Sequence, residues 1–164
     1  MQIIISDTTA LIILAKCNAM YLLTNFIEKI YIPTAVMEEL YFKDDIVKST
    51  IENSNFIEIK KPKNLKILNE IKTSNLDKGE TEAIALALET GLDLIIDEKS
   101  GRKYAKSKGI KILGLLGILK INFLNNDITY IELLYFIDEF KKVNYRIGSK
   151  VEKLFLKNLK NIIK

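Results

Sequence analysis

The sequence predicts an α/β fold with three layers (α/β/α), in which a parallel sheet of about five strands is covered by helices on both faces. Two observations support this prediction. Between residues 2 and 113, short segments rich in β-branched residues alternate with helical segments. The 164 residues are 48% apolar and 28% charged, with 7 Gly and 2 Pro, so the chain can bury a substantial core and leaves no room for a disordered tract.

The first part of the chain is expected to supply three strands. Isoleucines mark a buried strand at residues 2–6, Pro33 ends a second strand at residues 29–33, and residues 56–61 alternate like a third. Helices are expected at residues 8–17, at residues 18–28 with Asn18 as the cap, and at residues 35–42 with Thr34 as the cap.

The later part adds two strands and a helical tail. Asp77 opens a helix that stops at Gly91, a residue suited to a helix C-terminus. Strands are expected at residues 92–96 and 111–113, helices at 64–72 and 101–109, and further helices from residue 115 onward with Asp127 and Ser149 as caps. The chain is interpreted as one domain over residues 1–164, with a core of about 1–120 and a helical extension of about 121–164.

The absent residues exclude several chemistries. With no His, the chain can hold neither a Ser-His-Asp relay nor an imidazole metal site. The single cysteine, Cys17, forms no internal disulfide and is interpreted as a small buried side chain. No apolar run approaches the roughly 18 residues of a membrane span, and no basic segment precedes a cleavable apolar one. A cytoplasmic location is therefore expected.

Basic residues are concentrated in three places. There are 25 Lys and Arg against 21 Asp and Glu, which gives a net charge of +4. The clusters are Lys60, Lys61, Lys63 and Lys66; Lys99, Arg102, Lys103, Lys106, Lys108 and Lys111; and Lys150, Lys153, Lys157, Lys160 and Lys164. Each cluster is either a solvated helix face or a surface for a polyanion.

Acidic residues follow the expected strands. Asp7 comes after the first strand, Glu38 and Glu39 lie one turn into the helix after the second, and Asp97 and Glu98 follow the fourth. Ligands bind at the carboxyl ends of such strands, and carboxylates without imidazole or thiolate suit Mg²⁺ or Mn²⁺. Such an ion could assist attack on a phosphodiester.

Each acid also has a structural interpretation. Asp7 could cap the first helix, and Asp97 could cap the helix that follows it. Asp77 and Glu80 have the spacing of a capping box, which would account for Glu80 without a metal. Glu38 and Glu39 could be surface charges.

Helical geometry separates neighbouring acids. Glu80 shares a stripe with Ile84, Ala87 and Leu88, and therefore faces the core, whereas Glu82 aligns with Glu89. In the same way Glu39 lies beside the line from Val36 to Leu40, and Glu38 points further round. A carboxylate on an apolar stripe needs a partner, which a metal ion would supply.

The chain resembles the PIN-domain family. The motifs that carry the resemblance are SDTTALIILAK, IPTAVMEEL, LDKGETEAIALALETG, LIIDEKSGRKYA and ILGLLGIL, which cover about residues 1–120. They are similar to a VapC-related subgroup with S-D-[ST]-x-L-I, P-x-x-V-x-x-E-L, G-E-x-E-A-I and D-E-x-x-G-R-x-x-A. The resemblance implies a Rossmann-like parallel sheet of order 3-2-1-4-5 and a carboxylate pocket for Mg²⁺ or Mn²⁺.

The resemblance also implies site residues. The motifs align Asp7, Glu39, Glu80 and Asp97 with catalytic acids, and add Glu98 to the metal ligands. Ser6 and Thr8 are expected to support the first acid by hydrogen bonding. The expected phosphate contacts are Lys99, Arg102, Lys103 and Lys106. Two positions depart from the family: Glu80 stands where Asp is usual, and Glu98 ends the closing pair, where Asp-Asp or a polar residue followed by Asp is common.

The function implied is metal-dependent cleavage of single-stranded RNA, as the toxin of a toxin–antitoxin pair, with a homodimer and a small antitoxin protein as expected partners. The alternative is a PIN fold that binds RNA or protein with little turnover. A receiver-like or phosphatase-like domain is a third class, but the phosphatase pattern would need D-x-D where the chain has Asp7-Thr8-Thr9. The last two helices either cover the sheet or form a surface for a subunit or an antitoxin.

Overall fold

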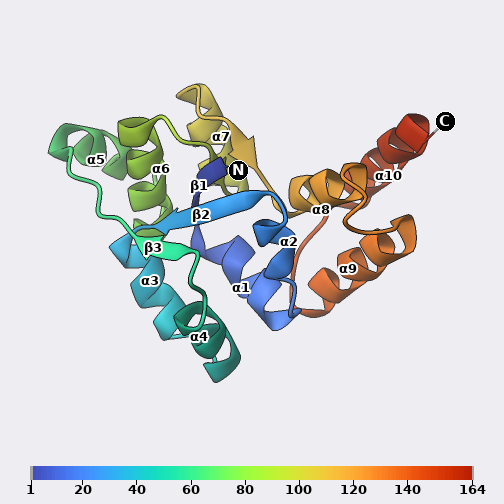
Figure 1. The fold of residues 1–164 in the computed structure, drawn as a ribbon. Coiled ribbons are helices and arrows are strands. Elements are labelled where there is room, and N and C mark those ends of the chain that lie inside the picture. Colours follow the sequence, from blue (N-terminus) through green and yellow to red (C-terminus); the bar gives the residue numbers. More distant parts are fainter. Residues whose placement is uncertain (1, 164) are drawn as a thin grey trace.

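A parallel sheet of five strands runs through the middle of the core (Figure 1). The computed structural model describes residues 2–163, and the strand order is β3-β2-β1-β4-β5. The strands are β1 (Gln2–Ser6), β2 (Ile27–Ile32), β3 (Ile57–Ile59), β4 (Leu94–Ile95) and β5 (Ile112–Leu113). The predicted fold class and strand order are both confirmed.

Helices connect the strands and cover both faces of the sheet. They are α1 (Thr8–Lys16), α2 (Tyr21–Thr24), α3 (Thr34–Tyr41), α4 (Asp45–Glu52), α5 (Leu65–Lys72), α6 (Lys78–Thr90), α7 (Lys99–Ser107), α8 (Leu115–Leu124), α9 (Tyr130–Lys142) and α10 (Ser149–Ile163). None of these is long and apolar enough to span a bilayer.

The strands have a buried side chain toward each helical layer, as a sheet in the middle of three layers requires. In β1, Ile4 belongs to the core cluster that contains residues of α1, α8 and α9, while the next residue, Ile5, belongs to the cluster that contains residues of α5, α6 and α7. Ile95 and Ile96 divide between the same two clusters. The alternation follows from the two-residue period of a strand.

The central strand β1 fixes where the acids meet. It pairs with β2 through Ile4 and Ile30, and with β4 through Ser6 and Ile95. The chain therefore leaves β1 toward β2 on one side and reaches β4 only later on the other, which makes the gap between β1 and β4 the switch point of the topology. The backbone N–H of Asp7 donates to the carbonyl of Ile95 at 3.0 Å and closes this end of the pair.

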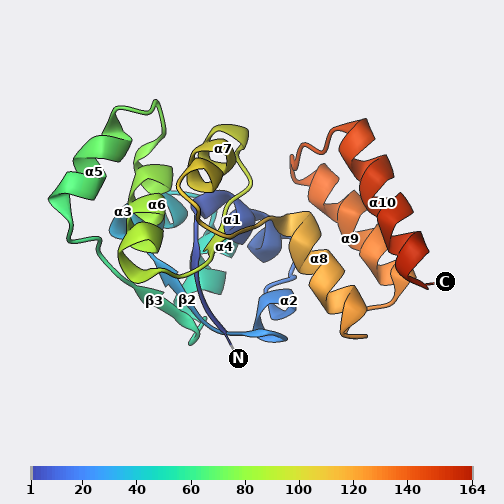
Figure 2. The ribbon, with the colours of Figure 1, turned by 90° about the horizontal axis from the view of Figure 1, so that it is seen from above.

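The last three helices lie together on the side of the molecule away from α5 (Figure 2). Phe136 and Phe140 of α9 and Leu159 of α10 are buried in the core cluster that contains α1 and β2. Buried Asn122 of α8 donates to the carbonyl of Leu22 at 2.8 Å, which ties this group to α2. The helices α9 and α10 thus contribute to one of the two core clusters.

The region between β1 and β2 differs from the prediction. In place of a helix over residues 18–28, the structure has only the short α2, and β2 already begins at Ile27. Asn18 is not a helix cap. Its φ of 52° lies in the left-handed region, which Asn tolerates, so that it turns the chain after α1.

Other helix boundaries also differ from the expected ones. Pro33, and not Thr34, is the cap residue before α3. The sequence prediction omitted α4, whose cap residue Asp44 accepts a hydrogen bond from the N–H of Val47 at 3.0 Å. Before α9, Thr129 forms a capping box with Glu132, so Asp127 is not the cap.

Candidate functional site

Acidic side chains surround a small cavity at the carboxyl end of β1. The cavity has a volume of about 20 Å³, and its lining residues are Asp7, Thr8, Thr9, Glu39, Asp77, Glu80 and Glu98. This volume is enough for about one water molecule or one ion. We call it the acid cavity. Four of the five predicted metal ligands, all except Asp97, line it.

Asp7 is the most buried of these acids, with 2% of its surface exposed. It is the cap residue of α1, where its Oδ1 accepts a long hydrogen bond of 3.5 Å from the N–H of Ala10. Burial raises the pKa of Asp7 well above its ordinary value, and the negative charges of Asp97 and Glu80 raise it further. Asp7 is therefore both a helix cap and a carboxylate held in an unfavourable environment.

The two oxygens of Glu80 have different surroundings. Asp77 and Glu80 form the capping box of α6: Asp77 Oδ1 accepts from the N–H of Glu80 at 2.7 Å, and Glu80 Oε2 accepts from the N–H of Asp77 at 3.2 Å. Glu80 Oε1 is buried without a hydrogen-bond partner among the described residues. Burial is the main cause of the raised pKa of Glu80. The capping box therefore accounts for only one oxygen and leaves the other without a partner.

Gly101 of α7 allows Glu80 to take this position. A Cβ on Gly101 would lie 2.6 Å from Glu80 Oε1 and 2.5 Å from Ile96 Cδ1, closer than packed atoms can approach. Any larger residue would therefore force Glu80 or Ile96 to move. This close packing explains why the sequence motif around residues 97–102 contains a glycine at residue 101.

Replacing Gly101 by Ala is expected to lower the free energy of unfolding by about 1–3 kcal/mol, because the new methyl group must push Glu80 or Ile96 aside. Urea denaturation measures the change. Gly148→Ala is the control: there a Cβ would meet only Val151 Cγ2 at 3.9 Å, so stability should stay within about 0.5 kcal/mol. Equal stability of the two variants would contradict the proposed close packing.

Glu39 lies at the rim of the acid cavity. Its Oε2 accepts a hydrogen bond from Thr8 Oγ1 at 2.8 Å, and its Oε1 lies 3.6 Å from Lys43 Nζ. Glu38 is exposed, as the helical geometry predicted, and it forms an ion pair with Lys78. Thr8 therefore supports Glu39, the second acid. This differs from the expectation that Thr8 supports Asp7.

Ser6 also differs from its expected role. Its hydroxyl donates to the backbone carbonyl of Asp7 at 3.0 Å, not to the carboxylate. Both Ser6 and Thr8 are buried next to the acid cavity. They fix the backbone at the end of β1 and the rotamer of Glu39, respectively.

Asp97 lies beside Asp7 but is held by other groups. Its Oδ2 accepts from the N–H of Leu115 at 2.9 Å, and its Oδ1 accepts from the hydroxyl of Tyr145 at 2.9 Å. Burial raises the pKa of Asp97, and these two hydrogen bonds partly offset that rise. The carboxylate of Asp97 therefore accepts a hydrogen bond from the first residue of α8. The cap residue of α7 is Glu98, and not Asp97.

Glu82 is not the free surface charge that its spacing predicted. It is partly buried, and its Oε2 accepts from the N–H of Ala35 at 3.0 Å, in the first turn of α3. A carboxylate here satisfies one of the unpaired N–H groups at a helix start. Glu82 therefore stabilises the helix that carries Glu39.

Basic side chains line a groove next to the acids. All four predicted phosphate contacts (Lys99, Arg102, Lys103 and Lys106) line a cavity of about 810 Å³ between α7, α8 and the segment before α10. Arg146 adds a further cation from that segment. We call this cavity the basic groove. Asp97 also lines it, which brings cations and acids together.

The side chains around the acid cavity supply the oxygen ligands that a hard cation prefers, but they are not grouped closely enough to coordinate one. The acid cavity is lined by oxygen donors alone, and Glu80 Oε1 is an unpaired buried oxygen. As placed, however, no three acidic or cysteine side chains within residues 2–163 are grouped closely enough to hold a metal ion.

Sequence reasoning did not identify Thr9, Tyr145 or Arg146 as site residues, and it considered Asp77 only as a capping residue. Thr9 and Asp77 stand in the quoted motifs, so their proximity to the acids could have been noticed. Tyr145 comes 48 residues after Asp97, and no local pattern marks the hydrogen bond between them.

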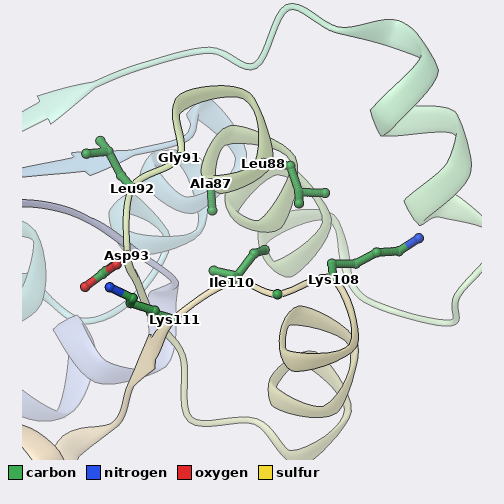
Figure 3. Close-up of a pocket in the computed structure, with 9 residues that line it drawn as sticks. Ala87, Leu88, Gly91, Leu92, Asp93, Lys108, Ile110 and Lys111 are labelled. Carbon is green, nitrogen blue, oxygen red and sulfur yellow. The ribbon is translucent and has the colours of Figure 1, made fainter.

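A further pocket lies at the amino ends of β4 and β5, away from the carboxyl ends that carry the acids (Figure 3). It has a volume of about 260 Å³ and forms where the loops after α6 and α7 lead into β4 and β5. Its lining includes Leu88, Asp93 and Lys111. It shares no residue with the acid cavity, so it does not belong to the candidate site.

The fold and site define a parallel α/β protein with carboxylates at the switch point of its sheet. A family model described as a PIN domain matches residues 3–161, and the chain belongs to this family. PIN domains are generally nucleases. No curated protein matches the chain.

Among solved structures, the chain is similar to a PilT N-terminus domain protein from the hyperthermophilic archaeon Sulfolobus solfataricus P2. The two share 23% identity over 72% of this chain and 91% of the other, with a TM-score of 0.46.

Proposed function

We propose that this PIN-domain protein is a metal-dependent endoribonuclease that cleaves single-stranded RNA, and that it acts as the VapC-like toxin of a toxin–antitoxin pair. The observation that carries the proposal is the acid cavity. There, burial raises the pKa of Asp7, and one oxygen of Glu80 has no hydrogen-bond partner among the described residues. Buried ionisable groups with strongly shifted pKa values are found at functional sites more often than elsewhere.

Asp7 and Glu80 are the residues that would hold a divalent cation. Glu39 and Glu98 line the same cavity, are partly or fully exposed, and could complete the ligand set by changing rotamer. A bound Mg²⁺ or Mn²⁺ would supply a water of lowered pKa and neutralise charge on a phosphate. Thr8 would orient Glu39, and the cations of the basic groove would bind the flanking phosphates.

Activity is expected with Mg²⁺ or Mn²⁺ and not with EDTA, because oxygen donors favour hard cations. The test is cleavage of a labelled single-stranded RNA by the purified protein. Stoichiometric zinc is not expected in the preparation, since no His is available and Cys17 is the single cysteine. Full activity in EDTA would refute the proposed mechanism.

The alternative is a PIN fold that binds RNA or protein with little turnover. Asp97 favours it, because both of its oxygens already accept hydrogen bonds from Leu115 and Tyr145. Tight RNA binding without cleavage under any divalent cation would support this alternative. Co-purification with a small protein encoded by a neighbouring gene, and a dimeric mass, would test the partners proposed for the toxin.

A further inference from the structure

We infer that the basic groove binds the unpaired bases of a single-stranded RNA next to the cleavage position, so that the segment 145–151 contributes to base preference. This inference rests on the proposed function and deepens it. Nothing in the sequence motifs assigns a role to this segment.

The groove is lined by both cations and apolar side chains. Five cations line it, against the single acid Asp97, whose carboxylate is occupied by Tyr145 and Leu115. Partly exposed apolar side chains, among them Ile112, Leu116 and Ile147, form much of the remaining surface. Phosphates suit the cations, Arg146 included, and the faces of bases suit the apolar surface.

The groove leads to the acid cavity through a third space. A cavity of about 350 Å³ shares Asp97, Lys99, Tyr145 and Arg146 with the groove. The same cavity shares Thr9 and Glu98 with the acid cavity. The three spaces therefore follow one another along the surface, and a strand with one phosphate at the acids would continue into the groove.

The size and lining of the groove favour single strands. A volume of about 810 Å³ is in the range of pockets that bury a small organic molecule, not a duplex. Bases can stack on apolar side chains only when they are unpaired. Because the lining offers few polar side chains besides the cations, Asp97 and Tyr145, we expect a graded base preference and not a strict code.

A tryptophan placed in the groove tests this inference directly, because the chain has no Trp of its own. Val151 lines the groove and is 56% exposed, so Val151→Trp should fold normally. Single-stranded RNA of about eight nucleotides, added in EDTA, is expected to quench the fluorescence of this tryptophan by stacking. Ile131→Trp on α9, at a site 78% exposed and outside the groove, is the control and should not be quenched.

A second pair of variants tests the same groove by affinity. Arg146→Ala should weaken binding of the RNA about tenfold at 0.1 M salt and reduce the salt dependence by about 0.7 in slope, as expected for one lost phosphate contact. Lys157→Ala changes a lysine of α10 that does not line the groove, and should stay within about twofold.

The outcomes separate this inference from the proposed function. Absent quenching of the Val151→Trp variant, or equal quenching by duplex RNA or by polyglutamate, would overturn the inference even if the protein cleaves RNA with Mg²⁺. Quenching by single strands alone, without cleavage under any divalent cation, would support the groove and refute the nuclease.

Discussion

Replacing Asp7 by Asn is expected to abolish RNA cleavage while leaving the melting temperature of the metal-free protein unchanged or higher. The carboxylate is buried and lies close to the charges of Asp97 and Glu80, so its ionisation opposes folding. Asn removes that charge and can still cap α1, since Asn and Asp are similarly good at this position. Activity and thermal unfolding of the purified variant measure both effects.

The pH dependence of stability gives a second readout of the same variant. Because the pKa of Asp7 is raised in the folded state, its stabilising contribution is complete below the ordinary value of 3.8 and is lost as the pH rises through the raised pKa. Wild-type protein should therefore lose stability over that range, and Asp7→Asn should lose less. Asp97 and Glu80 have raised pKa values too, so a part of the dependence remains.

Asp127→Asn is a suitable control, because Asp127 is exposed and lies outside the acid cavity. It should change neither cleavage nor the pH profile. If Asp7→Asn instead loses stability and keeps its activity, Asp7 is a helix cap and nothing more.

The second large effect is expected at Glu80. Glu80→Gln should remove Mn²⁺ binding and reduce the cleavage rate by orders of magnitude, because the unpaired buried oxygen no longer carries charge. The capping box should survive, since Gln serves in it as well as Glu does. Calorimetric titration with Mn²⁺ and RNA cleavage measure the two consequences independently.

Glu82→Gln is the matched control, two residues away on the same helix. Its amide oxygen can still accept the hydrogen bond from Ala35, so activity should change by less than about threefold. If Glu82→Gln is the inactive variant and Glu80→Gln turns over normally, the assignment of the metal ligand to Glu80 is wrong. Glu80 would then be only the capping partner of Asp77.

The core of the fold could be predicted because its signals are local. The run of isoleucines in β1, the stop at Gly91 and the stripe from Glu80 to Ala87 each describe the element in which they stand. Prediction from local signals failed where one residue type occurs in two kinds of local structure. Asn18 has a typical cap residue's side chain, but its left-handed φ turns the chain after α1. At α9 the signal was present, since Thr129 and Glu132 have capping-box spacing, and Asp127 was preferred wrongly.

The acid cavity was predictable only in part. Burial of Glu80 and exposure of Glu38 follow from helical geometry, and the structure agrees. The partners of these side chains depend on contacts between distant segments, which no local pattern encodes. Thr8 bonds to Glu39 across 31 residues, and Glu82 reaches the start of α3 across 47.

The hydrogen bond from Tyr145 to Asp97 has a consequence for the order of events during synthesis. Domains form from the N-terminus as the chain leaves the ribosome, and a contact across 48 residues cannot close before its later partner emerges. Asp7, Glu39 and Glu80 are all released earlier, together with most of the sheet. The carboxylate of Asp97 therefore lacks this hydrogen bond until Tyr145 has emerged, although the other acids have left the ribosome by then.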